Sequence, residues 1–401
     1  MGVCSGGGDS LKRSIEKSLA IMCVLLSFVS SASAAVVPFP ELCASGTPAQ
    51  IRAAILDGAD IVERNSEGVT PLMFAAAGNP DPLAASELLD AGASLTERDY
   101  AGLTPLMWAA ARNEEPQVSA LLLQRGAEVN ARSRDGVTPL LFAAGNNENP
   151  EIASLLLKAG ADKDAKNRSG WSAFMFAAAN NPNPEILRLL RSSGADPNAR
   201  SADGWTPLMR AAAHTSTPEI VREFLRFGAD ANARGGEQET PLMAAARFNT
   251  NAAVLRELLQ NGADPNARDK NGVTVLMWAA ANNLNPEIVS VLAKAGAYPD
   301  ARGKNGDTAI MGAAMSNPNP QVVAALVEAG ADVNMKGPRD WTALMFGALH
   351  TRNPEVVSSL LAAGANATIQ NRDGGRAIDY AGKNPHLKGT KAYWLLNEAS
   401  Y

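Results

Sequence analysis

Three histidines are the side chains best suited to acid–base catalysis near neutral pH or to binding a transition metal. They are His214, His350 and His386. His214 and His350 both stand eight residues after a threonine of a repeated pattern, four repeats apart. No two of the three have the spacing of metal ligands. We therefore interpret them as exposed turn residues and predict no metal site.

The carboxylates best placed for general acid–base chemistry all fall at one point of the same pattern. These are Glu151, Glu185, Glu219, Glu287 and Glu355. A carboxylate at the start of a helix offsets the positive end of the helix dipole, and this explains the repetition better than catalysis does. No G-x-S-x-G, Walker or H-E-x-x-H motif occurs. We predict neither an enzyme nor a cofactor.

A row of thioethers could bind copper or be oxidised. Its members follow the repeated threonine or serine by three residues, with one leucine among them: Met73, Met107, Leu141, Met175, Met209, Met243, Met277, Met311 and Met345. One apolar residue in each repeat is more typical of a buried packing ladder, which is what we predict.

Aromatic residues and arginine, which are enriched in protein interfaces, also follow the pattern. Three tryptophans directly precede the repeated threonine or serine: Trp171, Trp205 and Trp341. Large side chains follow it by four residues: Phe74, Trp108, Phe142, Phe176, Arg210, Trp278 and Phe346. All ten are candidate partner-binding residues, with the three tryptophans preferred because hairpin residues are difficult to bury. Burial of the phenylalanines between neighbouring repeats is the alternative.

The elements that position these side chains recur every 34 residues. The period is marked by Thr70, Thr104, Thr138, Ser172, Thr206, Thr240, Thr274, Thr308 and Thr342. Glycines from Gly58 to Gly364 keep the same spacing. A fixed period of this size indicates stacked supersecondary units.

The sequence of each unit predicts two short helices followed by an extended hairpin. In one unit, Thr138 is a suitable N-cap and Pro139 a suitable first residue for an inner helix. Asn149 and Pro150 repeat the arrangement for an outer helix, which Gly160 ends. The same proline recurs in the other units, and only Ala252 departs from it.

The segments GVTPLMFAA (68–76), GLTPLMWAA (102–110) and GWTPLMRAA (204–212) resemble the G-x-T-P-L-H-x-A-A signature of ankyrin repeats. ADPNAR (195–200 and 263–268) resembles the ankyrin hairpin. The resemblance extends from about residue 41 to the C-terminus. It implies an all-α, curved solenoid of stacked helix–turn–helix units, in which the residue four after the threonine leans toward the concave face.

Two features depart from that family. Its period is usually one residue shorter, and the additional residue here lies between the two helices, as in NNPNPE (180–185). Its motif histidine is replaced by the methionine row, so the family's Thr–His hydrogen bonds are not expected.

The ends of the chain differ from the repeats, as capping units do. We predict a degenerate N-terminal unit over 35–65, with an outer helix in 47–58, and nine full repeats over 66–370. A C-terminal cap follows over 371–401, in which residues 390–399 form a last helix packed on the final full repeat.

Residues 1–34 have the pattern of a secretory signal peptide. Lys12, Arg13 and Lys17 precede an apolar stretch at 19–29, and Ala32-Ser33-Ala34 is typical of a cleavage site. Cleavage would leave one cysteine, Cys43, so the fold is expected to be stable without a disulfide. The predicted location is the periplasm or the exterior of a bacterium, with no membrane attachment after cleavage.

The net charge of −5 argues against nucleic acid, because binding to phosphates requires a basic surface. The sequence therefore favours an exported, monomeric, non-catalytic scaffold that holds an unidentified protein partner with its concave face and hairpin tips. A protein that binds glycans of the cell envelope or plays a structural role there is the alternative. An enzyme with an unfamiliar site is less favoured.

Overall fold

The computed structural model describes residues 37–401, and the described chain consists of paired α-helices without a β-strand. The chain divides into two units, which are described separately. The first contains residues 37–177 and 192–195, and the second contains residues 178–191 and 196–401. This confirms the predicted all-α fold of stacked helix–turn–helix units.

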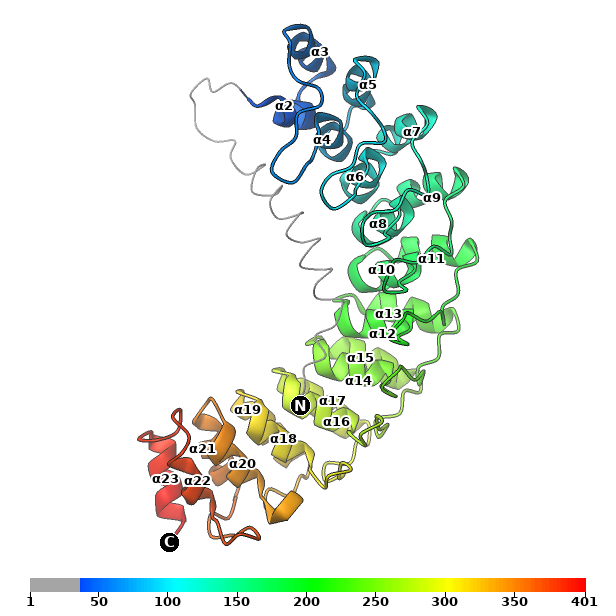
Figure 1. The fold of residues 1–401 in the computed structure, drawn as a ribbon. Helices are drawn as coiled ribbons and strands as arrows, with labels where there is room; N and C mark the ends of the chain where they lie inside the picture. Colours follow the sequence, from blue (N-terminus) through cyan, green and yellow to red (C-terminus); the bar gives the residue numbers. More distant parts are fainter. Residues whose placement is uncertain (1–36) are drawn as a thin grey trace. The chain divides into compact units, whose positions relative to one another are not determined.

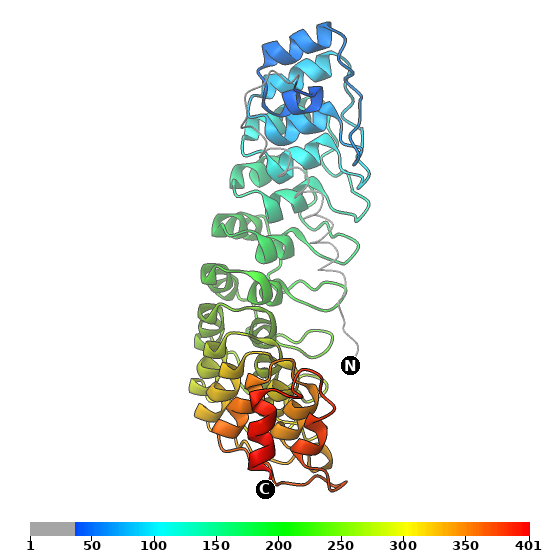
Figure 2. The same cartoon turned by 90° about the vertical axis from the view of Figure 1, so that its left-hand side faces the viewer.

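In each unit, one helix of every pair lies toward the hairpins, and we call these the inner helices (Figure 2). They are α2 (Phe39–Ser45), α4 (Pro71–Gly78), α6 (Pro105–Arg112), α8 (Pro139–Asn146), α10 (Ala173–Asn180), α12 (Pro207–His214), α14 (Pro241–Phe248), α16 (Val275–Asn282), α18 (Ala309–Ser316), α20 (Ala343–His350) and α22 (Ala377–Ala381).

The second helix of each pair is an outer helix (Figure 1). They are α3 (Pro48–Leu56), α5 (Pro82–Asp90), α7 (Pro116–Gln124), α9 (Pro150–Lys158), α11 (Pro184–Ser192), α13 (Pro218–Arg226), α15 (Ala252–Gln260), α17 (Pro286–Lys294), α19 (Pro320–Glu328), α21 (Glu355–Ala362) and α23 (Lys391–Ala399). Within each unit, an inner helix packs on the next inner helix and an outer helix on the next outer helix.

The inner helices begin where the sequence predicts. In α6, the Thr104 hydroxyl accepts a hydrogen bond from the Met107 N–H at 3.4 Å, and Pro105 is the first helical residue. The Thr104 N–H donates to the Met107 sulfur at 3.5 Å, so the thioether serves as acceptor where the family has histidine. The methionine row is buried, which confirms the predicted packing ladder.

In most repeats, a buried asparagine stands in the turn between the two helices, and Thr215 and Thr351 take its place in two of them. Asn113 donates its side-chain amide to the carbonyls of Ala76 and Asn79 in the preceding repeat, at 3.0 and 2.8 Å. Its own Oδ1 accepts from the Glu115 N–H. The same bonds recur at Asn79, Asn147, Asn249, Asn283 and Asn317. The turn between the two helices therefore carries a row of hydrogen bonds between repeats.

Several outer helices begin at an asparagine cap, and most end at a left-handed glycine. Asn285 Oδ1 accepts from the Glu287 N–H at 3.0 Å at the start of α17. Ile288 and Leu292, one helical turn apart, are buried on its inner side. Gly296, with a φ of 90°, follows the helix in a conformation that other residues adopt at a cost.

Arginines join the hairpins of successive repeats. Arg98 Nη1 donates to the carbonyl of Gly102 in its own hairpin and to that of Arg132 in the next, at 2.9 and 2.7 Å. Equivalent pairs of bonds are made by Arg64, Arg132, Arg200, Arg234, Arg268 and Arg302. These seven arginines therefore hold their hairpins to the next hairpin through main-chain carbonyls.

Both ends of the described chain carry shortened helix pairs. The predicted helix within 47–58 is α3, with Thr47 as its cap. It is preceded by α2, which the sequence analysis did not predict, and α2 buries Cys43 against α4. The predicted last helix is α23, capped by Thr390, and it packs on α21 and α22.

The predicted signal peptide, residues 1–34, lies outside the described residues. Over residues 37–401, each α-helix has at most nine residues, and none could cross a lipid bilayer.

Candidate interaction surface

Seven of the ten predicted partner-binding residues stand on inner helices, four residues after the N-cap. We call this place in the repeat the ladder position. It is occupied by Phe74, Trp108, Phe142, Phe176, Arg210, Ala244, Trp278, Gly312 and Phe346, and in the last helix pair by Tyr380.

Most large side chains at the ladder position are buried. Phe74, Trp108, Phe142 and Phe176 are each no more than 5% exposed, and Arg210 is 7% exposed. They are therefore core residues of the described chain, and the prediction that they form a contact surface is wrong for these five. Only Trp278 and Phe346 are partly exposed.

The three hairpin tryptophans pack back onto the ladder position. The Trp171 ring lies 5.4 Å from that of Phe176, and the Trp341 ring lies 5.1 Å from that of Phe346. Trp171 is only 8% exposed, so the expectation that hairpin tryptophans are difficult to bury is wrong for this residue. From its place directly before the N-cap, the ring packs edge-on against Phe176 instead of pointing away from the repeat. Trp205 and Trp341 are partly exposed.

Arg210 shows how a charge is accommodated at the ladder position. Its guanidinium lies 4.5 Å from the centre of the Trp205 ring and pairs with Asp203 at 2.5 Å. Burial lowers the pKa of Arg210, opposed by the charge of Asp203. Burial also raises the pKa of Asp203, but the bond from Ser201 and the charge of Arg210 lower it overall. The site holds a compensated ion pair rather than an acid–base catalyst.

An exposed aromatic side chain that the sequence analysis missed lies next to this pair. Phe248, at the end of α14, is 48% exposed and has its ring 6.4 Å from those of Trp205 and His214. Arg247 lies over two rings, 4.6 Å from the centre of Phe248 and 4.3 Å from that of Trp278. We call these five residues the α12–α16 cluster. The sequence contains one indication of this exposed ring. At the position equivalent to Phe248, the neighbouring repeats have the polar residues His214 and Asn282, which are typical of a surface position.

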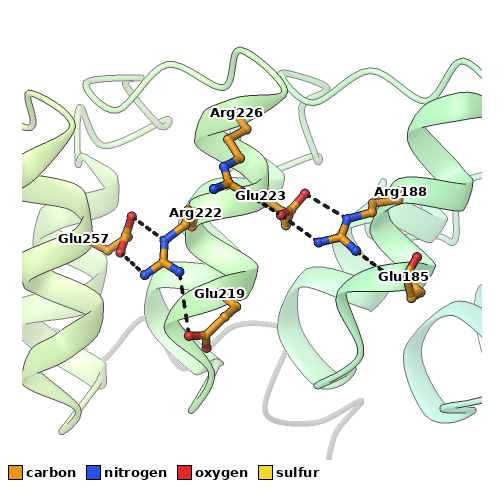
Figure 3. A network of polar contacts seen from close by, with 7 residues as sticks. All are labelled: Glu185, Arg188, Glu219, Arg222, Glu223, Arg226 and Glu257. Atoms are coloured by element: carbon orange, nitrogen blue, oxygen red, sulfur yellow. Dashed lines mark hydrogen bonds and ion pairs between the residues drawn. The ribbon is translucent and has the colours of Figure 1, made fainter.

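The carboxylates of the outer helices are engaged in ion pairs (Figure 3). Glu223 on α13 accepts from Arg188 on α11 and from Arg226, both at 3.0 Å, and is 7% exposed. Arg222 on α13 pairs in the same way with Glu257 on α15, at 2.8 Å. The hydrogen bond from Arg188 lowers the pKa of Glu223. These contacts join successive outer helices and therefore have a structural explanation.

The helix-start carboxylates lie where predicted. Glu185 and Glu219 occupy the first turns of α11 and α13, and each also approaches an arginine one turn later. His214 and His350 end α12 and α20 and are exposed, as is His386. Within residues 37–401, no group of three His, Cys, Asp or Glu side chains could hold a metal ion.

A family model described as ankyrin repeats in three copies matches the chain in overlapping segments. These are residues 42–133, 110–201, 174–269, 208–303, 242–337 and 276–373. The chain therefore belongs to the ankyrin repeat family. No match was found among curated proteins.

Proposed function

We propose that this protein is an exported, non-catalytic scaffold that binds a protein partner through the inner-helix and hairpin side of its repeats. Ankyrin repeats support a protein-binding role in general. The observation that carries the proposal is the α12–α16 cluster, in which Phe248 is 48% exposed among rings and an arginine. Exposed aromatic residues beside arginine are typical of interface hot spots.

Rigidity supports the same role. Every helix pair next to this cluster is tied to its neighbour by a buried asparagine or by an arginine of a hairpin. A surface that is ordered before binding loses less conformational entropy when a partner docks.

Site-specific crosslinking tests the proposal. A photo-crosslinking amino acid is placed at Phe248 or, as a matched control, at Gln260, which is exposed on the outer helix of the same repeat. We expect a discrete protein adduct from position 248 in living cells and none from position 260. Equal adducts from both positions would contradict a specific inner-side surface. An adduct that disappears on digestion with a muramidase would instead favour envelope glycan binding.

Export is proposed from the residues before the described chain. The basic residues Lys12, Arg13 and Lys17 and the Ala32-Ser33-Ala34 site support cleavage after Ala34. N-terminal sequencing of the protein recovered from cell fractions tests this. A first residue of Ala35 in the periplasm or medium is expected, and an intact leader in the cytoplasm would contradict it.

A further inference from the structure

Three hairpins of the first unit carry large side chains at one repeated place. The hairpins that precede α6, α8 and α10 project from one edge of that unit (Figure 2). Four residues before the repeated threonine or serine, they contain Tyr100, Arg134 and Arg168. We call these three residues the tip row.

Main-chain hydrogen bonds between successive hairpins position the tip row. The Arg134 N–H donates to the Ala101 carbonyl at 3.0 Å, and the Arg168 N–H donates to the Asp135 carbonyl at 2.9 Å. Each acceptor directly follows a residue of the row. Covalent geometry therefore limits the distance between consecutive Cα atoms of the row to about 11 Å. The backbone sets this spacing, so it does not depend on the side chains.

The two arginine side chains begin against the preceding hairpin. Arg134 Cγ would lie 3.2 Å from a Cβ added to Gly102, and Arg168 Cγ would lie 3.6 Å from a Cβ added to Gly136. Their aliphatic stems thus rest on the glycine backbone, and both residues are exposed. Tyr100 is also exposed, at 57%.

The charges of Arg134 and Arg168 are not neutralised within the protein. Neither side chain forms a hydrogen bond or an ion pair with any residue of 37–401. The two hairpin segments 131–137 and 165–171 contain four cationic side chains and one carboxylate, Asp135, in a chain of net charge −5. The tip row therefore has a local charge opposite to that of the whole protein, and this favours an anionic ligand.

The second unit provides a contrast at the same place of the hairpin. There, Lys270 pairs with Glu237, and Arg372 pairs with Asp340 at 3.4 Å. These cations have a counter-charge in a neighbouring hairpin, whereas the arginines of the tip row have none. Arginine and tyrosine are also the residue types that contribute most often to interface hot spots.

We propose that the tip row binds an extended acidic segment of the protein partner. Two carboxylates three residues apart pair with Arg134 and Arg168, and an apolar side chain three residues beyond them packs on Tyr100. The inference rests on the proposed binding function and names the chemistry of the partner.

The spacing and the charge both fit such a segment. An extended chain rises about 3.3 Å per residue, so three residues span about 10 Å, which matches the tip row. A guanidinium binds a carboxylate with two parallel hydrogen bonds. The ankyrin repeats and the negative net charge favour a polypeptide over a nucleic acid as the source of these anions.

Fluorescence anisotropy of labelled peptides with the full chain tests the proposal. The probes are Leu-Gly-Ser-Glu-Gly-Ser-Glu and its reverse sequence, each carrying an uncharged dye, at low ionic strength, where exposed charges are least screened. We expect saturable binding of at least one probe. Replacement of both glutamates by glutamine should weaken that binding by about tenfold or more, and moving the two glutamates side by side should weaken it about threefold.

Variants of the protein locate the site. Arg134→Ala and Arg168→Ala are each expected to weaken peptide binding about fivefold, and Tyr100→Ala about threefold. Arg372→Ala is the matched control, because it removes the same charge from the same place of a hairpin in the second unit, and it should leave binding unchanged. All four side chains are exposed, and far-UV circular dichroism checks that each variant is folded.

Three results would overturn the proposal: no saturable binding of either probe, equal binding of the glutamine peptide, or an equal loss of affinity in Arg372→Ala. Tighter, arginine-dependent binding of a single-stranded oligonucleotide or of phosphatidylserine vesicles would also overturn it, because the row would then recognise phosphate groups.

The crosslinking at Phe248 addresses the second unit and reports on the proposed function alone. If crosslinking finds a partner but neither peptide binds, the tip-row proposal is wrong and the scaffold proposal stands. Peptide binding that depends on Arg134 and Arg168 supports the tip row whatever the crosslinking shows.

Discussion

Asn283 donates its side-chain amide to the carbonyl of Asn249, one repeat earlier in the chain, at 2.9 Å. The same amide donates to the Ala246 carbonyl at 3.0 Å, and Asn283 Oδ1 accepts from the Asn285 N–H at 3.0 Å. A buried side chain thus completes the hydrogen bonding of two repeats, and a buried carbonyl or N–H that loses its partner is costly.

Replacement of Asn283 by alanine is therefore expected to lower the free energy of unfolding of the second unit by about 3 kcal/mol. Urea unfolding followed by circular dichroism measures this. Asn282→Ala is the matched control, because Asn282 is exposed and only caps its own helix through the Trp278 carbonyl. Equal losses in the two variants would contradict a special role for the buried row.

Glu223→Gln is expected to destabilise the protein by about 1–2 kcal/mol at neutral pH, since Arg188 and Arg226 lose a nearly buried counter-charge. Glu219→Gln is the control, because Glu219 is 54% exposed and lies 3.9 Å from its arginine. Chemical unfolding of the three proteins at neutral pH gives the comparison. A loss in Glu219→Gln as large as that in Glu223→Gln would show that burial of the ion pair is unimportant.

The same carboxylate contributes to acid sensitivity. Because the hydrogen bond from Arg188 lowers the pKa of Glu223 in the folded chain, its stabilisation is complete above the ordinary glutamate pKa and is lost as the pH falls through the lowered value. Between about pH 5 and pH 3, the wild-type protein should lose stability more steeply than Glu223→Gln. Parallel pH profiles of the two proteins would contradict this.

Trp171→Ala is expected to reduce stability by about 3 kcal/mol, because it removes a ring that is 8% exposed and packed on Phe176. Trp394→Ala, on α23, is the control, because Trp394 is 57% exposed and should change stability little. Thermal and urea unfolding distinguish the two variants. An unchanged midpoint in Trp171→Ala would mean that the ring is a surface residue after all.

The Cys43 thiol is expected to be unreactive toward thiol reagents in the folded protein. Burial raises the pKa of its thiol to about 12, with a smaller contribution from Glu63, and the side chain is 0% exposed. In a Cys4→Ser, Cys23→Ser background, a thiol reagent at about pH 8 should modify Cys43 only after unfolding in urea. Rapid modification of the folded protein would show that α2 opens readily.

The sequence by itself determined the repeat and its helices, because helix caps act over a few residues. Thr104 and Pro105 define the start of α6, and Asn285 defines the start of α17, whatever lies next to them in space. The period and the signature were sufficient to predict an all-α ankyrin array. The short helix α2, which has no side-chain cap, was missed.

Only the tertiary structure decided which of the repeated side chains are covered. The exposure of a residue at the ladder position depends on the side chains that pack on it from the hairpin and from the neighbouring repeats. Phe176 is buried under Trp171, whereas Trp278 at the same place of its repeat is partly exposed beneath Arg247. From the sequence, the buried asparagine is indistinguishable from an ordinary turn residue. Its hydrogen-bond acceptors belong to the preceding repeat, as Asn113 shows by donating to the carbonyls of Ala76 and Asn79.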